Sequence, residues 1–304
     1  MTAISDDNRL PPWFKVRLST GSRFIKVRNR IREGALNTVC ESAACPNRNE
    51  CWNEGTATFL ILGDRCTRNC GFCNIPPGRP DAPDHDEPER VAAAVESLGL
   101  DHAVITSVTR DDLPDGGASF FAEAIRAVRA RRPRCRIEVL IPDFRGAENA
   151  LELVLDACPD ILNHNIETVR SLYPSVRPQA DYDRSLQLLR RAKSAGAVTK
   201  TGLMLGLGEK REEVRSVLRD LRGAGCDMLT LGQYLRPGRN NLPVVRYYLP
   251  GEFAALRSEA LSLGFSAVAA GPLVRSSYQA EQHGKILNKT IRAAGEMDRS
   301  CPPE

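Results

Sequence analysis

The chain has no apolar stretch that approaches the roughly 20 residues needed to span a bilayer, and its charge is almost balanced. Its 304 residues carry 42 Lys and Arg against 38 Asp and Glu, a formal net charge of +4. This balance does not indicate a nucleic-acid partner. Residues 1–9 contain Asp6 and Asp7 and lack the apolar core of a secretory signal. We therefore expect a cytoplasmic protein whose partners include no membrane and no nucleic acid.

Cysteine, by contrast, is concentrated in one part of the chain. Six of the 10 cysteines fall between positions 40 and 73, in two groups of three. Three thiols cannot pair into disulfides without one left over, and thiols stay reduced in the cytosol. A four-iron cluster needs four ligands, so three cysteines leave one iron free to bind something else. The first triplet is Cys40, Cys45 and Cys51, spaced C-x4-C-x5-C, and the second is Cys66, Cys70 and Cys73, spaced C-x3-C-x2-C.

Short apolar runs alternate with helical patterns from residue 56 onwards, whereas residues 1–55 read as irregular. Such alternation predicts a parallel sheet with outer helices, as an open sheet or a barrel. The expected strands are 56–63, 102–108, 136–141, 160–166, 199–207 and 227–235, with a further short strand at 265–269. The expected helices are 87–98, 118–131, 147–157, 183–196, 210–222 and 252–263. We expect an N-terminal extension at 1–55, a core at 56–270 and a C-terminal tail at 271–304.

The second triplet has the form C-x3-C-x-aromatic-C, with Phe72 as the aromatic residue. This form is typical of radical S-adenosylmethionine (SAM) enzymes, in which the open iron of a 4Fe–4S cluster chelates SAM. Reductive cleavage of SAM then gives a 5′-deoxyadenosyl radical that abstracts hydrogen from unactivated carbon, which no side chain can do alone. The alternative is a zinc site formed by three cysteines and His85. Zinc sites usually combine two C-x2-C pairs, and this loop does not.

The first triplet and the C-terminal Arg-Ser-Ser-Tyr sequence make the resemblance more specific. The chain resembles the lipoyl synthases, radical SAM enzymes with an auxiliary four-iron cluster on C-x4-C-x5-C. The resemblance covers nearly the whole chain. The segments that carry it are Thr38–Cys40, Cys45–Asn47, Glu50–Trp52, Gly55–Phe59, Ile105–Val108, Arg110–Leu113, Glu138–Phe144, His164–Val169, Gly202–Glu209, Gly232–Leu235 and Arg275–Tyr278.

The resemblance implies a partial (β/α)6 barrel of the radical SAM type with N-terminal and C-terminal extensions. It also implies that two sulfur atoms are inserted at C6 and C8 of a protein-bound octanoyl chain, with one SAM consumed for each hydrogen abstraction. The auxiliary cluster would donate the sulfur, and its fourth ligand would be Ser276 or Ser277, of which we favour Ser277. An oxygen ligand binds soft iron weakly beside thiolates, which suits a cluster that is to be dismantled. We expect the two clusters to face each other across the barrel mouth.

Four further residues are candidate SAM contacts. Gly116 and Gly117 follow the second expected strand, where the resemblance suggests a tight turn that holds the SAM amino group. Asn165 and Glu167 lie at a strand end and could bond the ribose or the methionine group of SAM. The alternatives are an ordinary turn that begins a helix and a structural hydrogen-bond network.

The resemblance also implies partners for the chain. These are octanoylated lipoyl carrier domains, of 2-oxoacid dehydrogenase E2 or of the glycine-cleavage H protein, and an electron donor such as ferredoxin or flavodoxin. The basic residues between Arg17 and Arg32 could dock an acidic carrier, although a solvated charged face is the commoner explanation for such a run. Two positions depart from the family pattern: Asn241 stands where the family usually has His, and Thr201 where Ser is common.

Two other functions remain open from the residues alone. The chain could be another radical SAM enzyme that inserts sulfur into a different substrate. It could also be an iron–sulfur or zinc protein that only stores, carries or senses.

Overall fold

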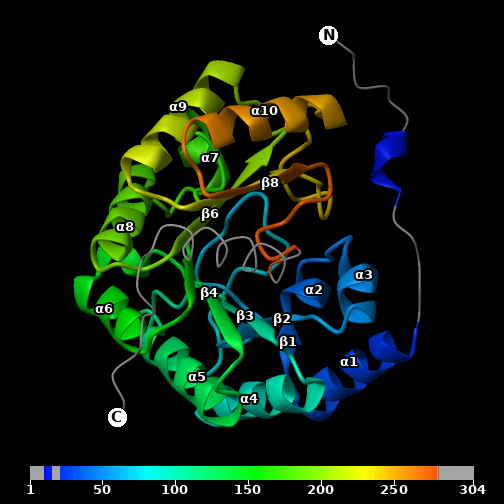
Figure 1. Cartoon of the computed structure of the whole chain (residues 1–304), viewed down its shortest axis with the longest axis vertical. Helices are drawn as coiled ribbons and strands as arrows, with labels where there is room; N and C mark the ends of the chain where they lie inside the picture. The colour runs from blue at the N-terminus through cyan, green and yellow to red at the C-terminus, as the bar shows by residue number, and fades with distance from the viewer. Residues whose placement is uncertain (1–9, 16–20, 279, 281–304) are drawn as a thin grey trace.

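A computed structural model describes residues 10–15, 21–278 and 280 of the chain. Most of the predicted C-terminal tail, from residue 281 onwards, lies outside the described residues. The described part forms one curved eight-stranded sheet in the strand order β1 to β8, with helices around its outer side (Figure 1). All neighbouring strands are parallel except β1, which pairs antiparallel with β2. The strands are β1 Asn37–Thr38, β2 Thr58–Ile61, β3 His102–Ser107, β4 Arg136–Leu140, β5 Ile161–Asn163, β6 Thr199–Leu205, β7 Met228–Gln233 and β8 Ala267–Gly271.

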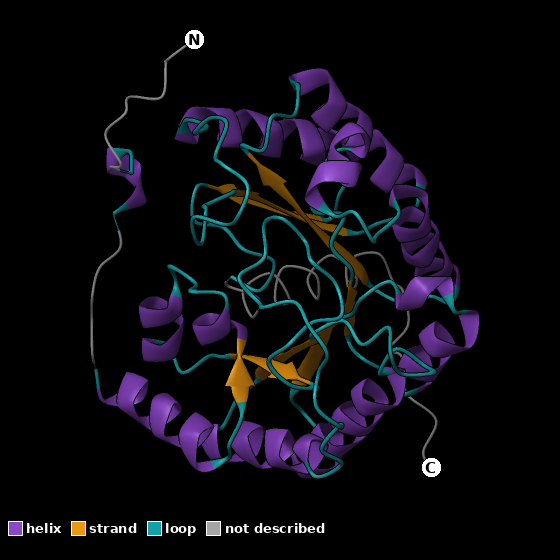
Figure 2. Cartoon of the chain, turned by 180° about the vertical axis from the view of Figure 1, so that it is seen from behind, coloured by secondary structure: helices purple, strands orange, loops and turns teal. Residues whose placement is uncertain are grey.

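Helices connect the strands along the outside of the sheet, and loops fill its concave side (Figure 2). The expected fold is confirmed, because a partial barrel of repeated strand–helix units is what these elements form. The helices of the barrel begin and end within two residues of the predicted positions, and the strands within three. The helices of eight or more residues in the barrel are α4 Glu87–Leu98, α5 Ala118–Arg131, α6 Glu148–Asp156, α8 Tyr182–Ser194, α9 Arg211–Gly223 and α10 Pro250–Ser262. Among the described residues, no helix is both long and apolar enough to cross a bilayer.

The expectation that residues 1–55 are irregular was wrong. Its described residues contain the 3-10 helix η1 Pro12–Phe14 and, besides β1, three α-helices, namely α1 Ser22–Glu33, α2 Val39–Ser42 and α3 Arg48–Asn53. Helix α1 buries Phe24, Val27 and Ile31, which recur at helical spacing and form one apolar stripe. Lys26, Arg28 and Arg30 lie between them, so that the segment reads as a run of basic residues rather than as an amphipathic helix.

The inner face of the sheet carries a buried polar cluster formed by side chains of β3, β4, β5 and β6. Lys200 of β6 donates through Nζ to both carboxylate oxygens of Glu138 on β4, at 2.9 and 3.0 Å. Asn163 of β5 donates to the same carboxylate at 2.9 Å, and the Nε2 atom of His102 lies 3.4 Å from it. Burial alone would raise the pKa of Glu138, but Lys200 and His102 hold it at about 2. This cluster therefore ties four strands together from the inside.

The barrel stays open between β1 and β8, the two ends of the strand order. The chain after β8 crosses this opening towards α2 and α3 (Figure 1). Gly232 of β7 permits the crossing, because a Cβ atom there would lie only 2.1 Å from the Val274 carbonyl oxygen. In the same segment, the Leu273 carbonyl accepts a 2.7 Å hydrogen bond from Asn47 Nδ2 of the N-terminal region. The tail thus closes onto the N-terminal region.

Removing the ammonium group of the buried polar cluster should destabilise the protein strongly. Lys200→Met leaves the fully buried Glu138 carboxylate without its cation, and we expect a loss of about 3–5 kcal/mol in the free energy of unfolding at pH 7. Urea unfolding measures this loss, with Glu138→Gln/Lys200→Met as the control that should recover part of it. The ion pair stabilises the fold above the ordinary carboxyl pKa of about 4.3. Its contribution should therefore disappear as the pH falls towards 2. A loss below about 1 kcal/mol in Lys200→Met would contradict this role.

Candidate functional site

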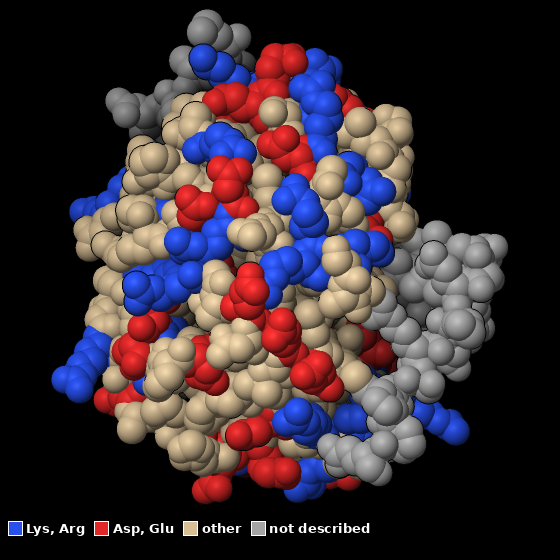
Figure 3. Space-filling model, turned by 90° about the vertical axis from the view of Figure 1, so that its left-hand side faces the viewer, with Lys and Arg blue, Asp and Glu red and all other residues tan. Residues whose placement is uncertain are grey.

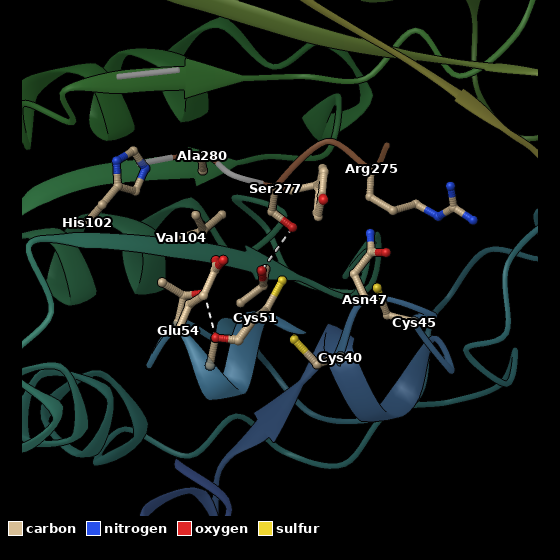
Figure 4. A pocket seen from close by; sticks show the side chains of 14 residues that line it. Cys40, Cys45, Asn47, Cys51, Glu54, His102, Val104, Arg275, Ser277 and Ala280 are labelled. Atoms are coloured by element: carbon tan, nitrogen blue, oxygen red, sulfur yellow. Dashed lines mark hydrogen bonds between the residues drawn. The ribbon is translucent and has the colours of Figure 1, made fainter. Parts of the chain in front are cut away.

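The first cysteine triplet lines a cavity on the inner side of the sheet. Cys40 lies in α2, Cys51 lies in α3 and Cys45 lies in the turn between these helices. All three thiols point towards one space, which Ser277 of the tail enters from the opposite side (Figure 4). The remaining lining residues are Asn47, Glu54, Thr56, Ala57, Thr58, His102, Val104, Arg275, Tyr278 and Ala280.

Short helices and one large aromatic residue hold this triplet in place. Thr38 accepts a hydrogen bond from the Glu41 backbone N–H at 3.3 Å and so caps the beginning of α2. Trp52, next to Cys51, is 1% exposed and stacks on Phe24 of α1 with ring centroids 5.1 Å apart. Helix α1 therefore supports the cysteine-bearing helices from behind.

Burial makes the three thiols weak acids. It raises the pKa of Cys40 to about 11 and that of Cys51 to about 12, and neighbouring cysteines add to both shifts. Burial also raises the pKa of Cys45, although Arg275 and Arg48 partly oppose it. A thiol must lose its proton to bind a metal. Occupation of this cavity by iron would thus release protons from groups that otherwise keep them at neutral pH.

The tail reaches the cavity through three specific contacts besides the Asn47 bond. Thr58 Oγ1, at the start of β2, donates to Ser277 Oγ at 2.9 Å. Tyr278 donates through its hydroxyl to Glu50 of α3 at 2.8 Å. Arg275 is half-buried and lines the cavity beside Cys45. Of the two adjacent serines, it is Ser277 that lines the cavity.

The second triplet lies in the loop that follows β2, beyond the carboxyl end of that strand. A parallel bridge joins Cys66 to Pro77 and closes the base of the loop. The backbone N–H groups of Arg68 and Thr109 approach Cys66 Sγ at 3.4 and 3.3 Å. Burial raises the pKa of Cys73 to about 12. The loop is thus ordered by its own backbone, and its sulfur atoms have N–H groups nearby that would stabilise thiolates.

A buried ion-pair cluster anchors the same loop. Arg68, between the first two cysteines of the triplet, donates to Asp111 at 2.7 and 2.9 Å and to Asp143 at 2.6 Å. The side chains of Arg68 and Asp143 are 3% and 0% exposed, and Asp111 is 22% exposed. The Arg68 guanidinium holds the pKa of Asp143 far below its usual range despite burial. The loop after β2 is therefore fixed to the loops after β3 and β4.

Gly116 and Gly117 form the turn that begins α5. Asp115 accepts hydrogen bonds from the backbone N–H groups of Gly117 and Ser119, at 2.9 and 2.8 Å. Gly117 has a φ of +90°, and a Cβ atom there would lie 2.3 Å from Leu62 Cδ1, so only glycine fits. These contacts account for the turn as the beginning of a helix. A SAM contact at the two glycines remains a prediction.

Asn165 and Glu167 lie together just beyond β5. Asn165 Nδ2 donates to Glu167 Oε1 at 3.0 Å, while Asn165 Oδ1 is buried and makes no hydrogen bond among the described residues. Glu167 has a φ of +63°, an uncommon backbone conformation for a residue other than glycine. Burial raises its pKa, and Arg177 and Asn165 oppose that rise. The two residues form a polar group that has a free acceptor.

Arg177 connects this polar group to the second triplet. Its Nη1 atom donates to the Asn165 carbonyl at 2.9 Å, and its Nε atom is buried without a hydrogen bond within the described part of the chain. Its positive charge counteracts the burial that raises the pKa of Cys70. Asn165, Glu167 and Arg177 thus belong to the same site as Cys70.

The two triplets lie towards opposite ends of β2. Thr58, the first residue of the strand, contacts Ser277, whereas the loop with Cys66 follows the last residue, Ile61. Helices α2 and α3 approach the sheet from its β1 edge. That the two clusters would face each other across the barrel mouth stays a prediction. One direct hydrogen bond of 2.8 Å still links the segments, from Asn74 Nδ2 to the Ser42 carbonyl.

Neither triplet has the geometry of a zinc site. In the part of the chain that the structure describes, no three His, Cys, Asp or Glu side chains are close enough together to hold a single metal ion. His85, the proposed fourth zinc ligand, instead stacks on Phe120 with ring centroids 5.2 Å apart. In a four-iron cluster each cysteine binds a different iron, so its thiolates stand further apart than around one ion. That each triplet holds a four-iron cluster stays a prediction.

Sequence reasoning missed three residues of the second site: Arg68, Arg177 and Asn241. Arg68 lies inside the cysteine motif, where any residue type reads as a spacer. Arg177 lies in a short segment after α7 Tyr173–Val176 and has no local pattern around it. Asn241 was noticed only as a departure from the family pattern, yet its Nδ2 atom donates to the Cys73 carbonyl at 2.8 Å. Each becomes recognisable only once the loops are brought together.

Comparison with known proteins agrees with this geometry. A family model of the radical SAM superfamily matches residues 60–221, and a model of the N-terminal domain of lipoyl synthase matches residues 3–45. The chain is 57% identical to lipoyl synthase from Rubrobacter xylanophilus over 90% of this chain and 85% of that protein. It is 51% identical to lipoyl synthase from Shouchella clausii over 96% of both chains.

Solved structures with similar folds are distant in sequence. SuiB from Streptococcus suis, bound to the precursor peptide SuiA, superimposes with a TM-score of 0.56 at 11% identity, over 89% of this chain and 58% of that chain. HydG, a maturase of the FeFe-hydrogenase, gives a TM-score of 0.51 at 17% identity, over 74% of this chain and 58% of that chain. At these identities, the likeness concerns the fold alone.

The partial barrel and the three-cysteine loop after its first parallel strand define a radical SAM enzyme, a class that uses a 4Fe–4S cluster and SAM. Within this class, the N-terminal match and the close relatives decide the family. The chain belongs to the lipoyl synthases, which insert sulfur by radical chemistry.

Loss of the Arg68 side chain should destabilise the loop of the second triplet. Arg68→Met leaves the buried Asp143 carboxylate with only Arg184, at 3.2 Å, and we expect a loss of about 2–4 kcal/mol in the free energy of unfolding. Chemical unfolding measures this loss. Arg65→Met is the matched control, because Arg65 is exposed in the same loop and its replacement should change stability by less than about 0.5 kcal/mol. Equal effects of the two substitutions would show that the ion-pair cluster does not anchor the loop.

Proposed function

We propose that the lipoyl synthase reaction is divided between the two cysteine sites of this chain. Cys66, Cys70 and Cys73 would hold the cluster that binds SAM. Cys40, Cys45, Cys51 and Ser277 would hold the auxiliary cluster that donates sulfur. When bound, these groups supply a 5′-deoxyadenosyl radical, which abstracts hydrogen at C6 and C8 of the octanoyl chain, and the two sulfur atoms that are inserted there.

The observation that carries this proposal is the convergence of Ser277 on the first triplet. The Ser277 hydroxyl enters a cavity whose three thiols come from a segment more than 200 residues earlier, and Thr58 holds it in place at 2.9 Å. Three thiols and one hydroxyl match the four ligands that a four-iron cluster needs. Oxygen is the weakest of the four for soft iron. The ligand set therefore suits a cluster that gives up its sulfur.

The residues around Cys70 would orient SAM. The unpaired Asn165 Oδ1 can accept a hydrogen bond from an amino or hydroxyl group, and the buried Arg177 can bind a carboxylate. Glu167 is held beside both by its bond from Asn165. Gly116 and Gly117 would let the backbone approach the methionine part of SAM. Together these groups would fix SAM in one pose, as a directed radical reaction requires.

The partners follow from the chemistry of the reaction. We infer that the octanoyl chain arrives on a lipoyl carrier domain, of 2-oxoacid dehydrogenase E2 or of the glycine-cleavage H protein. A small electron carrier such as ferredoxin or flavodoxin would reduce the cluster. We place the enzyme in the cytoplasm, where the six cysteines of its two triplets would remain reduced.

Separate replacement of the two triplets should separate the two half-reactions. With octanoyl-peptide, SAM and a strong reductant, Cys40→Ala should still form 5′-deoxyadenosine but no lipoyl product, whereas Cys70→Ala should form neither. Two clusters predict about eight iron atoms per chain in the wild type, and each variant should retain about half of them. The assay is a single turnover with isotopically labelled cluster sulfide, which should appear in the product. Lipoyl product from Cys40→Ala would show that the first triplet is not the sulfur source.

We further propose that α1 docks the carrier. Arg23, Lys26 and Arg32 are exposed on this helix, whose apolar side lies against the cysteine-bearing α3. By contrast, the face that Figure 3 shows mixes acidic and basic side chains. Opposite charges also pair on the surface between α6 and α8, where Arg191 lies 3.5 Å from Glu148 and 4.0 Å from Glu152. Among the described residues, Arg23, Lys26 and Arg32 form no ion pair, whereas Arg30 pairs with Glu33. An acidic carrier domain would therefore find free basic side chains at α1.

Charge reversal on α1 should weaken carrier binding. Arg23→Glu/Lys26→Glu/Arg32→Glu should raise the dissociation constant about tenfold at low salt, because long-range attraction contributes mainly to encounter. The dependence of the dissociation constant on salt should also decrease. Isothermal titration at two salt concentrations measures both effects. Arg211→Glu/Arg219→Glu on the exposed side of α9 is the control. Unchanged binding in the α1 variant, or equal weakening in the control, would reject α1 as the docking helix.

A further inference from the structure

The loop after β7 lies directly against the loop of the second triplet. The Leu242 backbone N–H donates to the Gly71 carbonyl at 2.9 Å. Gly71 has no side chain at this contact, and a Cβ atom there would lie 2.8 Å from Leu242 Cδ1. The two loops therefore meet at backbone distance, between the second and third cysteines of the triplet.

Asn241 makes a second contact, to the third cysteine itself. Its Nδ2 atom donates to the Cys73 carbonyl at 2.8 Å across 168 residues of sequence. The Cys73 N–H bonds within its own loop, to the Cys70 carbonyl at 3.0 Å. Both backbone polar groups of Cys73 are thus held, and with them the direction of its Cα–Cβ bond. The Ile75 backbone N–H in addition lies 3.4 Å from the Cys73 sulfur.

Hydrogen bonds within its own loop hold the backbone of Asn241 in place. The Asn241 N–H donates to the Gly238 carbonyl at 3.1 Å, and its own carbonyl accepts from Arg236 Nε at 2.8 Å. Tyr234, the residue directly after β7, donates through its hydroxyl to the Leu242 carbonyl at 2.7 Å. Because the backbone of Asn241 has little freedom to move, its side-chain amide can hold the loop of the second triplet in place.

We propose that Asn241 is a positioning residue for the SAM-binding cluster: its amide N–H holds the Cys73 carbonyl, so that the Cys73 thiolate keeps its place when SAM occupies the open iron. The inference rests on the proposed ligand role of Cys66, Cys70 and Cys73. It also explains in physical terms how Asn can stand at position 241, where the family usually has His. An imidazole Nδ1–H branches from the side chain at the same atom as the Asn Nδ2, so the position requires a hydrogen-bond donor and needs no base.

The test measures SAM binding by the cluster rather than product formation. The full chain is reconstituted anaerobically with iron and sulfide, and the reduced cluster is titrated with SAM while its electron paramagnetic resonance spectrum is recorded. Asn241→Leu keeps the shape and removes the donor, Asn241→Asp places an acceptor against the carbonyl, and Asn241→His keeps a donor. Asn240→Leu is the matched control, because Asn240 is the exposed neighbour.

Asn241→Leu should weaken SAM binding by about two- to tenfold, the worth of one hydrogen bond to a positioned group. Asn241→Asp should weaken it at least as much, while Asn241→His and Asn240→Leu should stay close to the wild type. Binding by both the Leu and the Asp variant at the wild-type level would overturn the inference, as would a His variant as weak as the Leu variant. Should Asn241→Leu not fold, the comparison of the Asp and His variants decides in the same way. A wild type whose spectrum does not respond to SAM would instead refute the ligand assignment itself, and the inference with it.

Discussion

The open edge of the barrel between β1 and β8 is the constraint on which the first site depends. A closed barrel would leave no route by which the chain after β8 could reach the helices beside β1. Here the chain crosses that gap, passes close over Gly232 and places Ser277 in the cavity of Cys40, Cys45 and Cys51. The cost of an open edge is a row of unpaired backbone groups. In this chain, the short antiparallel β1 covers one side of it.

The second site depends on the opposite property of the fold, the common direction of its parallel strands. Because β2 to β8 run the same way, the loops after them meet at one end of the sheet. This brings the cysteine loop after β2 together with Asp111, Asp143, Arg177 and Asn241, which come from four other loops. Each of them supplies a charge or a hydrogen bond to the cysteine loop or to a residue beside it. The protein thereby prepares the loop before iron binds.

Both sites bury thiols in surroundings that favour their protonated form, as the raised pKa values of Cys40, Cys51 and Cys73 show. Metal binding at either site would have to overcome this preference, because a thiol loses its proton when it binds a metal. The two sites differ in the groups that lie beside their three thiols. The first has the Ser277 hydroxyl, and the second has the polar side chains of Asn165, Glu167 and Arg177.

The sequence alone determined the helices and strands of the barrel and the six candidate cysteine ligands. Hydrophobic periodicity, strand length and cysteine spacing are properties of single segments of the chain. It failed at residues 22–53, where the basic residues of α1 obscured its apolar stripe and two short helices left no periodic signal. Only the tertiary structure decided which of Ser276 and Ser277 enters the cavity, that the two triplets lie towards opposite ends of β2, and that Arg68, Arg177 and Asn241 join the second site. Those facts depend on how loops that are far apart in sequence approach one another in space. A pattern within a single segment contains no information about the distance between two such loops.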